Sequence, residues 1–328
     1  MSSSAPARVL QAFLPRSWYK AVRRFLLSFR NSVSMDNRQS YLTRGFQHYV
    51  LRRKPTLHHF EIHITDHCNL KCKSCGHYSN ISPKSFLDLQ IFERDMTAVR
   101  GYFRRVEQIF LMGGEPLLHP QVAEFVTRAR RIFPEARICL MTNGLLVTRM
   151  PQAVWDALRE SRVILLCDDY PIKLPKERIA ELSAKNQVTL EWTEFNDRFF
   201  MAPLDAKGGS DPGSSYEQCQ GYSQCPLLRD GKIYLCAPAG MSPILREHFD
   251  LQDFALQPED GFDLLRPPTL ARSWQALRFL SHPTPFCRFC DYAHFHRFAW
   301  SHPTTGQLSE WTQVQDDPLP VHYIPESD

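Results

Sequence analysis

The feature that most constrains this chain is a set of three closely spaced cysteines, Cys68, Cys72 and Cys75. They follow residues 59–65, where apolar and polar side chains alternate as they do in a strand. Three thiols at this spacing on the loop after a strand can converge on one point. Three thiolates form a soft ligand set, which suits zinc or the irons of an iron–sulfur cluster better than magnesium or calcium. Three ligands rather than four also leave a coordination position open.

Beyond residue 58, short apolar runs alternate with amphipathic stretches. We expect strands at 59–65, 108–112, 137–141, 163–167 and 188–192, and helices at about 87–104, 120–132, 151–160 and 175–184. Such alternation implies an α/β fold with a parallel sheet. In sheets of this kind, ligands bind beyond the carboxyl ends of the strands. The cysteine loop begins at such an end.

Two further motifs stand at strand ends. Gly113-Gly114-Glu115-Pro116 follows the second expected strand, and Asn143-Gly144 follows the third. Adjacent glycines let the backbone approach a ligand closely. The Glu115 carboxylate, like a strand-end carbonyl, can accept hydrogen bonds from an ammonium group. A glycine pair alone usually marks a turn. Its position one strand after the cysteine loop is what favours a ligand-binding role.

Together, the C-x3-C-x2-C loop and the Gly-Gly-Glu-Pro segment resemble the radical S-adenosylmethionine (radical SAM) enzymes. One departure is Ser74, because the residue before the third cysteine is commonly aromatic in that family. The resemblance implies a partial (β/α)6, TIM-like barrel over about residues 58–205. It implies a [4Fe-4S] cluster that chelates S-adenosylmethionine through its fourth iron and takes its protein ligands from Cys68, Cys72 and Cys75. The residues implied to bind the cofactor are Gly113, Gly114, Glu115 and Asn143.

In that family, the cluster passes one electron to S-adenosylmethionine, and a 5′-deoxyadenosyl radical then takes a hydrogen atom from the substrate. The resemblance therefore implies an enzyme of oxidoreductase or epimerase type. It also implies an external electron donor such as flavodoxin or ferredoxin. A structural zinc knuckle is the alternative interpretation of the triplet, in which the chain is a zinc-stabilised interaction protein.

Five more cysteines lie in the second half of the chain: Cys219, Cys225, Cys236, Cys287 and Cys290. They follow residues 203–218, whose richness in Gly, Ser, Pro and Asp predicts a linker or mobile loop. The dipeptide Asp230-Gly231 predicts a hairpin turn. Cys225 and Cys236 would then flank one hairpin.

This arrangement, ending in a distant C-x-x-C, resembles the Twitch domain, the shorter relative of the SPASM domain, which holds one auxiliary [4Fe-4S] cluster. The resemblance implies that Cys236, Cys287 and Cys290 are ligands, while Cys219 and Cys225 compete for the fourth place. We assign that place to Cys225. Zinc is the alternative metal, since four thiolates suit both.

The thiol left over is a candidate hydrogen-atom donor to a substrate radical. With Cys225 assigned as a ligand, this thiol is Cys219. Cys167, at the end of the fourth expected strand, is a second candidate donor. A buried cysteine in a strand is, however, usually a small apolar residue.

The N-terminal part of the chain is strongly basic. Residues 1–57 carry 11 Lys and Arg and one acidic residue, Asp36, whereas the whole chain has a net charge of only +4. Apolar residues recur at helical spacing over 7–30, with a break at Pro15, which predicts amphipathic helices. We expect this arm to pack on the main domain or to contact an anionic membrane surface. No nucleic-acid partner is expected, because no nucleic-acid-binding motif accompanies the charge.

The expected domains are a basic amphipathic helical arm (1–57), the partial barrel (58–205), an auxiliary cluster domain (206–300) and a tail (301–328). The aromatic and basic stretch 295–311 is expected to pack on the auxiliary domain or to close over the active site. Clustered cysteines, together with the lack of a signal peptide or a run of membrane-span length, predict a cytoplasmic protein.

Compact Twitch-bearing relatives often act on sugars, aminosugars or glycans, so oxidation or epimerisation of such a substrate is the expected reaction. Maturation of a ribosomally made peptide is the alternative. Enzymes of that kind commonly carry a winged-helix module before the core, and residues 1–57 show no helix–strand hairpin pattern. The sequence itself does not name the substrate.

Overall fold

The computed structural model describes residues 51–219 and 225–314. The basic arm lies outside these residues as far as position 50, and so does the end of the tail, 315–328. The described residues from Arg52 onward belong to one compact unit. No helix among the described residues is long and apolar enough to cross a membrane.

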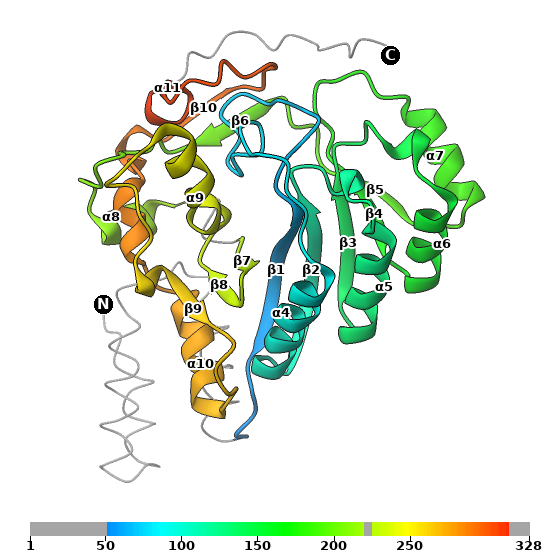
Figure 1. The fold of residues 1–328 in the computed structure, drawn as a ribbon, viewed down its shortest axis with the longest axis horizontal. Coiled ribbons are helices and arrows are strands. Elements are labelled where there is room, and N and C mark those ends of the chain that lie inside the picture. Colours follow the sequence, from blue (N-terminus) through cyan, green and yellow to red (C-terminus); the bar gives the residue numbers. More distant parts are fainter. Residues whose placement is uncertain (1–50, 220–224, 315–328) are drawn as a thin grey trace, which may run out of the picture. The chain divides into compact units, whose positions relative to one another are not determined.

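The fold is built on a mostly parallel sheet (Figure 1). Five strands that follow one another in the chain are also neighbours in the sheet, in the order β5-β4-β3-β2-β1. Their bounds are β1 Thr56–Thr65, β2 Arg105–Gly113, β3 Arg137–Thr142, β4 Ile164–Cys167 and β5 Leu190–Trp192. The helices between them are α4 Leu89–Tyr102, α5 Val122–Ile132, α6 Gln152–Ser161 and α7 Lys176–Lys185. Every strand and helix expected over residues 59–192 is therefore present, and the α/β fold is confirmed.

A sixth parallel strand comes from much later in the chain. β7 (Leu227–Arg229) pairs with β1 on the edge opposite β2, and β8 (Lys232–Tyr234) and β9 (Gly261–Asp263) extend the sheet antiparallel. The expected hairpin turn joins β7 to β8, with Asp230 at φ 51° and Gly231 at φ 74°. The central sheet thus runs across the boundary expected between residues 205 and 206.

The two faces of β1 differ in chemistry. Phe60, Ile62 and Ile64 belong to the main hydrophobic core, which α4, α5 and α6 cover with residues such as Phe92, Phe125 and Leu158. Because side chains alternate along a strand, Glu61 and His63 lie on the opposite, inner face. Both are nevertheless buried, with exposed fractions of 5% and 4%. β1 therefore places polar groups inside the fold, next to the loop that carries the cysteines.

The remaining elements surround the second group of cysteines. A two-stranded antiparallel sheet joins β6 (Arg198–Met201) to β10 (His296–Ala299). The helices are α8 Pro212–Gln218, α9 Ala237–Phe249, α10 Leu270–Phe279 and α11 Ser309–Thr312. Short 3-10 helices are η1 Pro116–Leu118, η2 Val147–Arg149, η4 Pro258–Asp260, η5 Pro285–Phe289 and η6 Tyr292–His294.

The prediction of a linker or mobile loop over residues 203–218 is wrong for the second half of that range. Residues 212–218 form α8, which Asp211 caps by accepting a hydrogen bond from the backbone N–H of Ser214 at 2.8 Å. Pro212 occupies the first turn, where its missing N–H costs nothing. The Asp-Pro pair is a helix-start signal, and the abundance of Gly and Ser around it obscured that signal.

Candidate metal and cofactor site

The three cysteines of the first motif lie together at the carboxyl end of β1. Burial raises the pKa of each thiol, to about 12 for Cys68, and the charges of neighbouring cysteines add to the effect at Cys68 and Cys72. Thiolates in such a place need a positive partner, and a metal centre supplies one. The donor set therefore fits a thiolate-bound metal centre.

The spacing of the sulfur atoms distinguishes between kinds of metal centre. In the described part of the chain, the three potential ligands with donor atoms all within 4.8 Å of one another are Glu61, His63 and His77, and no three cysteines approach so closely. A single tetrahedral zinc, with Zn–S bonds of about 2.3 Å, would hold its sulfurs roughly 4 Å apart. Cysteines that each bind a different iron of a cluster stand farther apart. The spacing favours a multi-iron cluster over one zinc ion.

Several N–H groups point at these sulfurs. The Cys68 Sγ accepts from the side-chain amide of Asn143 at 3.5 Å and from the backbone N–H of Leu70 at 3.3 Å. The Cys72 Sγ accepts from the indole N–H of Trp300 at 3.3 Å. Such hydrogen bonds stabilise negative charge on sulfur and tune the reduction potential of a cluster. Asn143, selected from the sequence at the end of β3, thus lies against the cysteine loop.

Residues 300–313 lie across the same loop, and we call them the strap. The backbone N–H of Lys73 donates to the carbonyl of Ser301 at 3.0 Å, and that of Thr304 donates to the carbonyl of Lys71 at 2.8 Å. The indole of Trp311 donates to the carbonyl of Cys75 at 3.0 Å. The tail therefore contacts the cysteine loop directly, through its backbone.

Glu310 joins the strap to Ser74, the residue that departs from the family pattern. Its carboxylate accepts the backbone N–H of Ser74 at 3.0 Å, and the Ser74 hydroxyl donates to the Glu310 carbonyl at 2.8 Å. Ser74 is buried and has φ 54°, a conformation that disfavours large side chains. Trp300, stacked on Tyr170 with ring centroids 5.9 Å apart, provides an aromatic contact beside the cysteines instead.

The glycine pair at the end of β2 is required by close backbone packing. A Cβ on Gly113 would lie 2.1 Å from the carbonyl oxygen of Thr65, and one on Gly114 would lie 2.2 Å from that of His67. The backbone N–H of Gly114 donates to the carbonyl oxygen of Thr65 at 2.9 Å, and that of Glu115 donates to the carbonyl oxygen of His67 at 3.1 Å. The pair thus presses the end of β2 against the start of the cysteine loop.

The carboxylate of Glu115 lies buried inside the fold, although its motif suggested a group open to a ligand. Its carboxylate is completely buried and accepts hydrogen bonds from the backbone N–H groups of Leu117 and Asn143 and from the hydroxyl of Thr142, all at 2.8–2.9 Å. Burial raises its pKa to about 7. The side chain therefore joins the ends of β2 and β3, and its contact with a cofactor stays a prediction.

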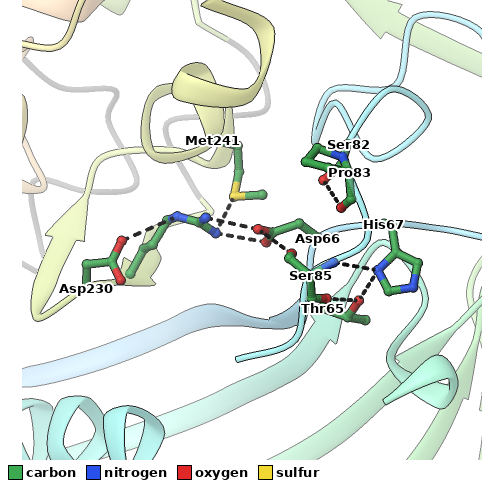
Figure 2. A network of polar contacts seen from close by, with 9 residues as sticks. Thr65, Asp66, His67, Ser82, Pro83, Ser85, Asp230 and Met241 are labelled. Atoms are coloured by element: carbon green, nitrogen blue, oxygen red, sulfur yellow. Dashed lines mark hydrogen bonds and ion pairs between the residues drawn. The ribbon is translucent and has the colours of Figure 1, made fainter. Parts of the chain in front are cut away.

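An ion pair fixes the start of the cysteine loop to β7 (Figure 2). The guanidinium of Arg229 donates to both oxygens of Asp66, at 2.8 and 3.0 Å. The hydroxyl of Ser85 donates to the same carboxylate at 3.0 Å. The sequence analysis missed this pair, because its two members are 163 positions apart and meet only when β7 joins β1.

Four of the five cysteines in the second half of the chain line one cavity, and they are not the four that the sequence assigned as ligands. Cys219, Cys236, Cys287 and Cys290 line it. The hydroxyl of Tyr292 donates to the Cys219 Sγ at 2.8 Å. Cys225 is not among the residues that line this cavity; burial, together with the nearby charges of Glu61 and Cys219, raises its pKa to about 12. The structure thus brings Cys219, rather than Cys225, together with the other three.

Cys167 lies in the hydrophobic core. Its exposed fraction is 0%, and it packs in the main core with Leu165. Burial raises its pKa, and the charges of Glu115 and Asp168 add to this. Cys167 therefore packs as a small apolar residue of the core, and its role as a hydrogen donor stays a prediction.

Glu61, His63 and His77 form a buried polar group that the sequence analysis did not select. Burial raises the pKa of Glu61 to about 8, and it lowers the pKa of His63 and that of His77, the latter to about 4. The alternation of β1 was the available signal, because it places Glu61 and His63 on one face. Nothing local indicated that His77 would join them.

Comparison with known proteins finds a family profile that covers the first site. The profile of the Radical SAM superfamily matches residues 62–172. The matched range includes the cysteine loop, the end of β2 and Asn143. The superfamily implies a [4Fe-4S] cluster and S-adenosylmethionine.

Curated relatives share part of this region. Molybdenum cofactor biosynthesis protein 1 of Mus musculus is 33% identical over 129 residues, which cover 37% of this chain and 19% of that protein. GTP 3′,8-cyclase of Alkaliphilus metalliredigens is 32% identical over 103 residues, covering 31% of this chain and 32% of the relative. The matched stretches thus span a third or less of these relatives.

Among solved structures, BtrN in complex with AdoMet and 2-DOIA is similar over 72% of this chain and 93% of that one. The sequence identity is 14% and the TM-score is 0.42. No conclusion about this chain follows from a score of that size.

The strap predicts a measurable contribution of Glu310 to stability. Replacing Glu310 with Ala leaves the buried N–H of Ser74 and the donors of Thr304 and Thr305 without their acceptor. We expect the free energy of unfolding, measured by urea denaturation, to fall by about 1–3 kcal/mol. Glu160→Ala is the matched control, because that side chain is 72% exposed and pairs only with Arg159 among the described ion pairs. Equal effects of the two substitutions would contradict the strap as a structural element.

Proposed function

We propose that this chain is a radical SAM enzyme in which Cys68, Cys72 and Cys75 hold the [4Fe-4S] cluster. The observation that carries the proposal is the position of the three thiols, one buried and two half-buried, at a strand end within the matched range. Their wide spacing supports a cluster and argues against the zinc-stabilised, non-enzymatic alternative. When bound, the cluster reduces S-adenosylmethionine and so supplies a radical that removes hydrogen from a substrate.

The contributions of the chain itself are orientation and exclusion of water. Asn143 and Trp300 donate to the sulfurs of Cys68 and Cys72 and so stabilise their charge. Leu70, Ile172 and Trp300 form an apolar cluster around Cys72, and the strap covers the backbone of the loop. An electron must reach this buried place from outside, and an external donor such as flavodoxin or ferredoxin is part of the proposal.

The second cavity is proposed to hold an auxiliary [4Fe-4S] cluster, with Cys219, Cys236, Cys287 and Cys290 as ligands. The gathering of these four thiols in one cavity supports the ligand set. Four thiolates suit an iron–sulfur cluster as they suit zinc, and the likeness of this cysteine pattern to the Twitch domain supports the cluster. Cys225 is then the spare thiol and takes the role of candidate hydrogen donor that the sequence assigned to Cys219.

The substrate is proposed to be a sugar, an aminosugar or a glycan. The support is the likeness of the second cysteine group to that of compact Twitch-bearing enzymes, which often act on such substrates. Peptide maturation is kept as the alternative outcome of the substrate test below.

The first test removes the radical SAM cluster. In the C68A/C72A/C75A variant, we expect the iron content to fall by about four atoms per chain, since one [4Fe-4S] cluster is lost. Reductive cleavage of S-adenosylmethionine to 5′-deoxyadenosine, followed by liquid chromatography, should cease. Cys139→Ala is the control, because Cys139 is buried in β3 and belongs to neither cysteine group. Cleavage that persists in the triple variant would show the assignment to be wrong.

The second test compares two cysteines that lie six positions apart. Cys219→Ala should lose about one cluster's iron and sulfide after anaerobic reconstitution, because it removes one of four ligands. Cys225→Ala should keep both clusters. The reverse result would restore the assignment made from the sequence, and equal results for the two variants would refute any division of roles.

The third test identifies the class of substrate. Sugars and aminosugars, free or nucleotide-linked, are supplied with deuterium on their ring carbons, and the mass of the 5′-deoxyadenosine is measured. We expect deuterium to appear in it, because the radical removes hydrogen from the substrate carbon. Parallel assays with deuterated peptides serve as the comparison, and the C68A/C72A/C75A variant is the blank. Transfer from a peptide alone would overturn the proposed substrate class while leaving the radical chemistry intact.

A further inference from the structure

Two histidines and a glutamate converge inside the fold, apart from both cysteine groups. Glu61 and His63 come from the inner face of β1, and His77 lies in the loop two residues beyond Cys75. One donor atom from each of the three lies within 4.8 Å of the others. The Nε2 of His77 is 4.0 Å from the Oε1 of Glu61, and the rings of His63 and His77 meet edge to face at 4.8 Å.

These donor atoms are buried without partners. The Oε1 of Glu61 and both ring nitrogens of His63 form no hydrogen bond with any described residue, although their residues are only 5% and 4% exposed. Leaving a buried polar atom unsatisfied costs about 1–3 kcal/mol. Three such atoms at one point indicate that the site is completed by something the chain does not itself provide.

Charge favours a cation as the missing component. The guanidinium of Arg229, whose charge acts on His63, already donates to both oxygens of Asp66. Glu61 has one ion-pair partner among the described residues, the ring of His77 at 4.0 Å, which is beyond hydrogen-bond distance. A divalent ion satisfies a carboxylate and two imidazoles at once, which a single hydrogen-bonding group of a substrate cannot do.

The donor set also restricts the kind of ion. Two imidazoles and one carboxylate are the ligands of many catalytic zinc sites, which keep one position open. The same set binds non-haem iron(II). Magnesium and calcium prefer a set made of oxygen atoms. The ligands therefore select a transition metal of zinc type.

We propose that Glu61, His63 and His77 bind one divalent transition-metal ion, separate from both iron–sulfur sites, on the inner face of the sheet. Its open coordination position can take a water molecule or an oxygen or nitrogen atom of the substrate. Binding of the ion does not depend on the radical chemistry proposed above. An experiment can therefore refute the ion site without refuting the radical chemistry, and the reverse.

The test measures zinc in protein whose iron–sulfur clusters have been reconstituted anaerobically. The protein is exposed to zinc and passed through gel filtration with a weak chelator, and its zinc and iron are then counted by mass spectrometry. About one zinc per chain should remain. X-ray absorption at the zinc edge should show only nitrogen and oxygen ligands at about 2.0–2.1 Å, without the Zn–S distance of about 2.3 Å.

Substitutions locate the ion. Glu61→Gln and His63→Phe should each reduce the retained zinc at least tenfold while the iron content stays unchanged, which also shows that the variants have folded. His59→Phe is the matched control, because His59 lies on the same strand and the same face, against Phe110, and it should keep its zinc. The proposal is overturned if the wild type retains no zinc, if its zinc has sulfur ligands, or if both variants retain it. A wild-type protein that binds no iron or forms no 5′-deoxyadenosine would instead contradict the radical SAM proposal.

Discussion

The rest of the structure depends on a close backbone contact between the ends of β1 and β2. Gly113 and Gly114 lie so near to the carbonyls of Thr65 and His67 that any side chain on either glycine would overlap an oxygen atom. This contact fixes the direction in which the chain leaves β1, and so it fixes the cysteine loop. Asp66 and Arg229 then attach the same point to β7, on the opposite side of β1. The loop thus starts from a place that both neighbouring strands determine.

The far side of the loop is held by residues more than 220 positions later. Trp300 donates to a cysteine sulfur, and Glu310 accepts from Ser74. The carboxylate of Glu310 is partly desolvated, which raises its pKa, but hydrogen bonds from Thr305, Ser74 and Thr304 outweigh this and lower it. It therefore stays ionised at neutral pH and accepts strong hydrogen bonds. Because Ser74 is drawn to the strap at a positive φ, an aromatic ring at that position would have no place.

The sequence predicted what local periodicity determines. The strands and helices over 59–192, the hairpin at Asp230 and the place of the first cysteine loop all follow from patterns a few residues long. Contacts between distant segments were not predictable in this way. The pairing of β7 with β1, the strap, and the gathering of Cys219 with Cys236 in one cavity each depend on segments that meet only in the folded chain. Glu115 shows the same limit, because its motif was recognised but its burial against Thr142 was not.

The alternation of β1 explains how two sites of different chemistry arise side by side. Phe60, Ile62 and Ile64 must face the helices, because they fill the main core, and a shift of one residue would expose all three. Their burial therefore forces Glu61 and His63 to the inner face, where their polar atoms are costly to leave unsatisfied. The thiolates beyond the strand provide soft ligands, while the strand itself provides nitrogen and oxygen ligands. β1 thus carries nitrogen and oxygen donors along its inner face and leads to the thiolates beyond its end. Its hydrophobic face fixes the register of the strand and so the position of both donor sets.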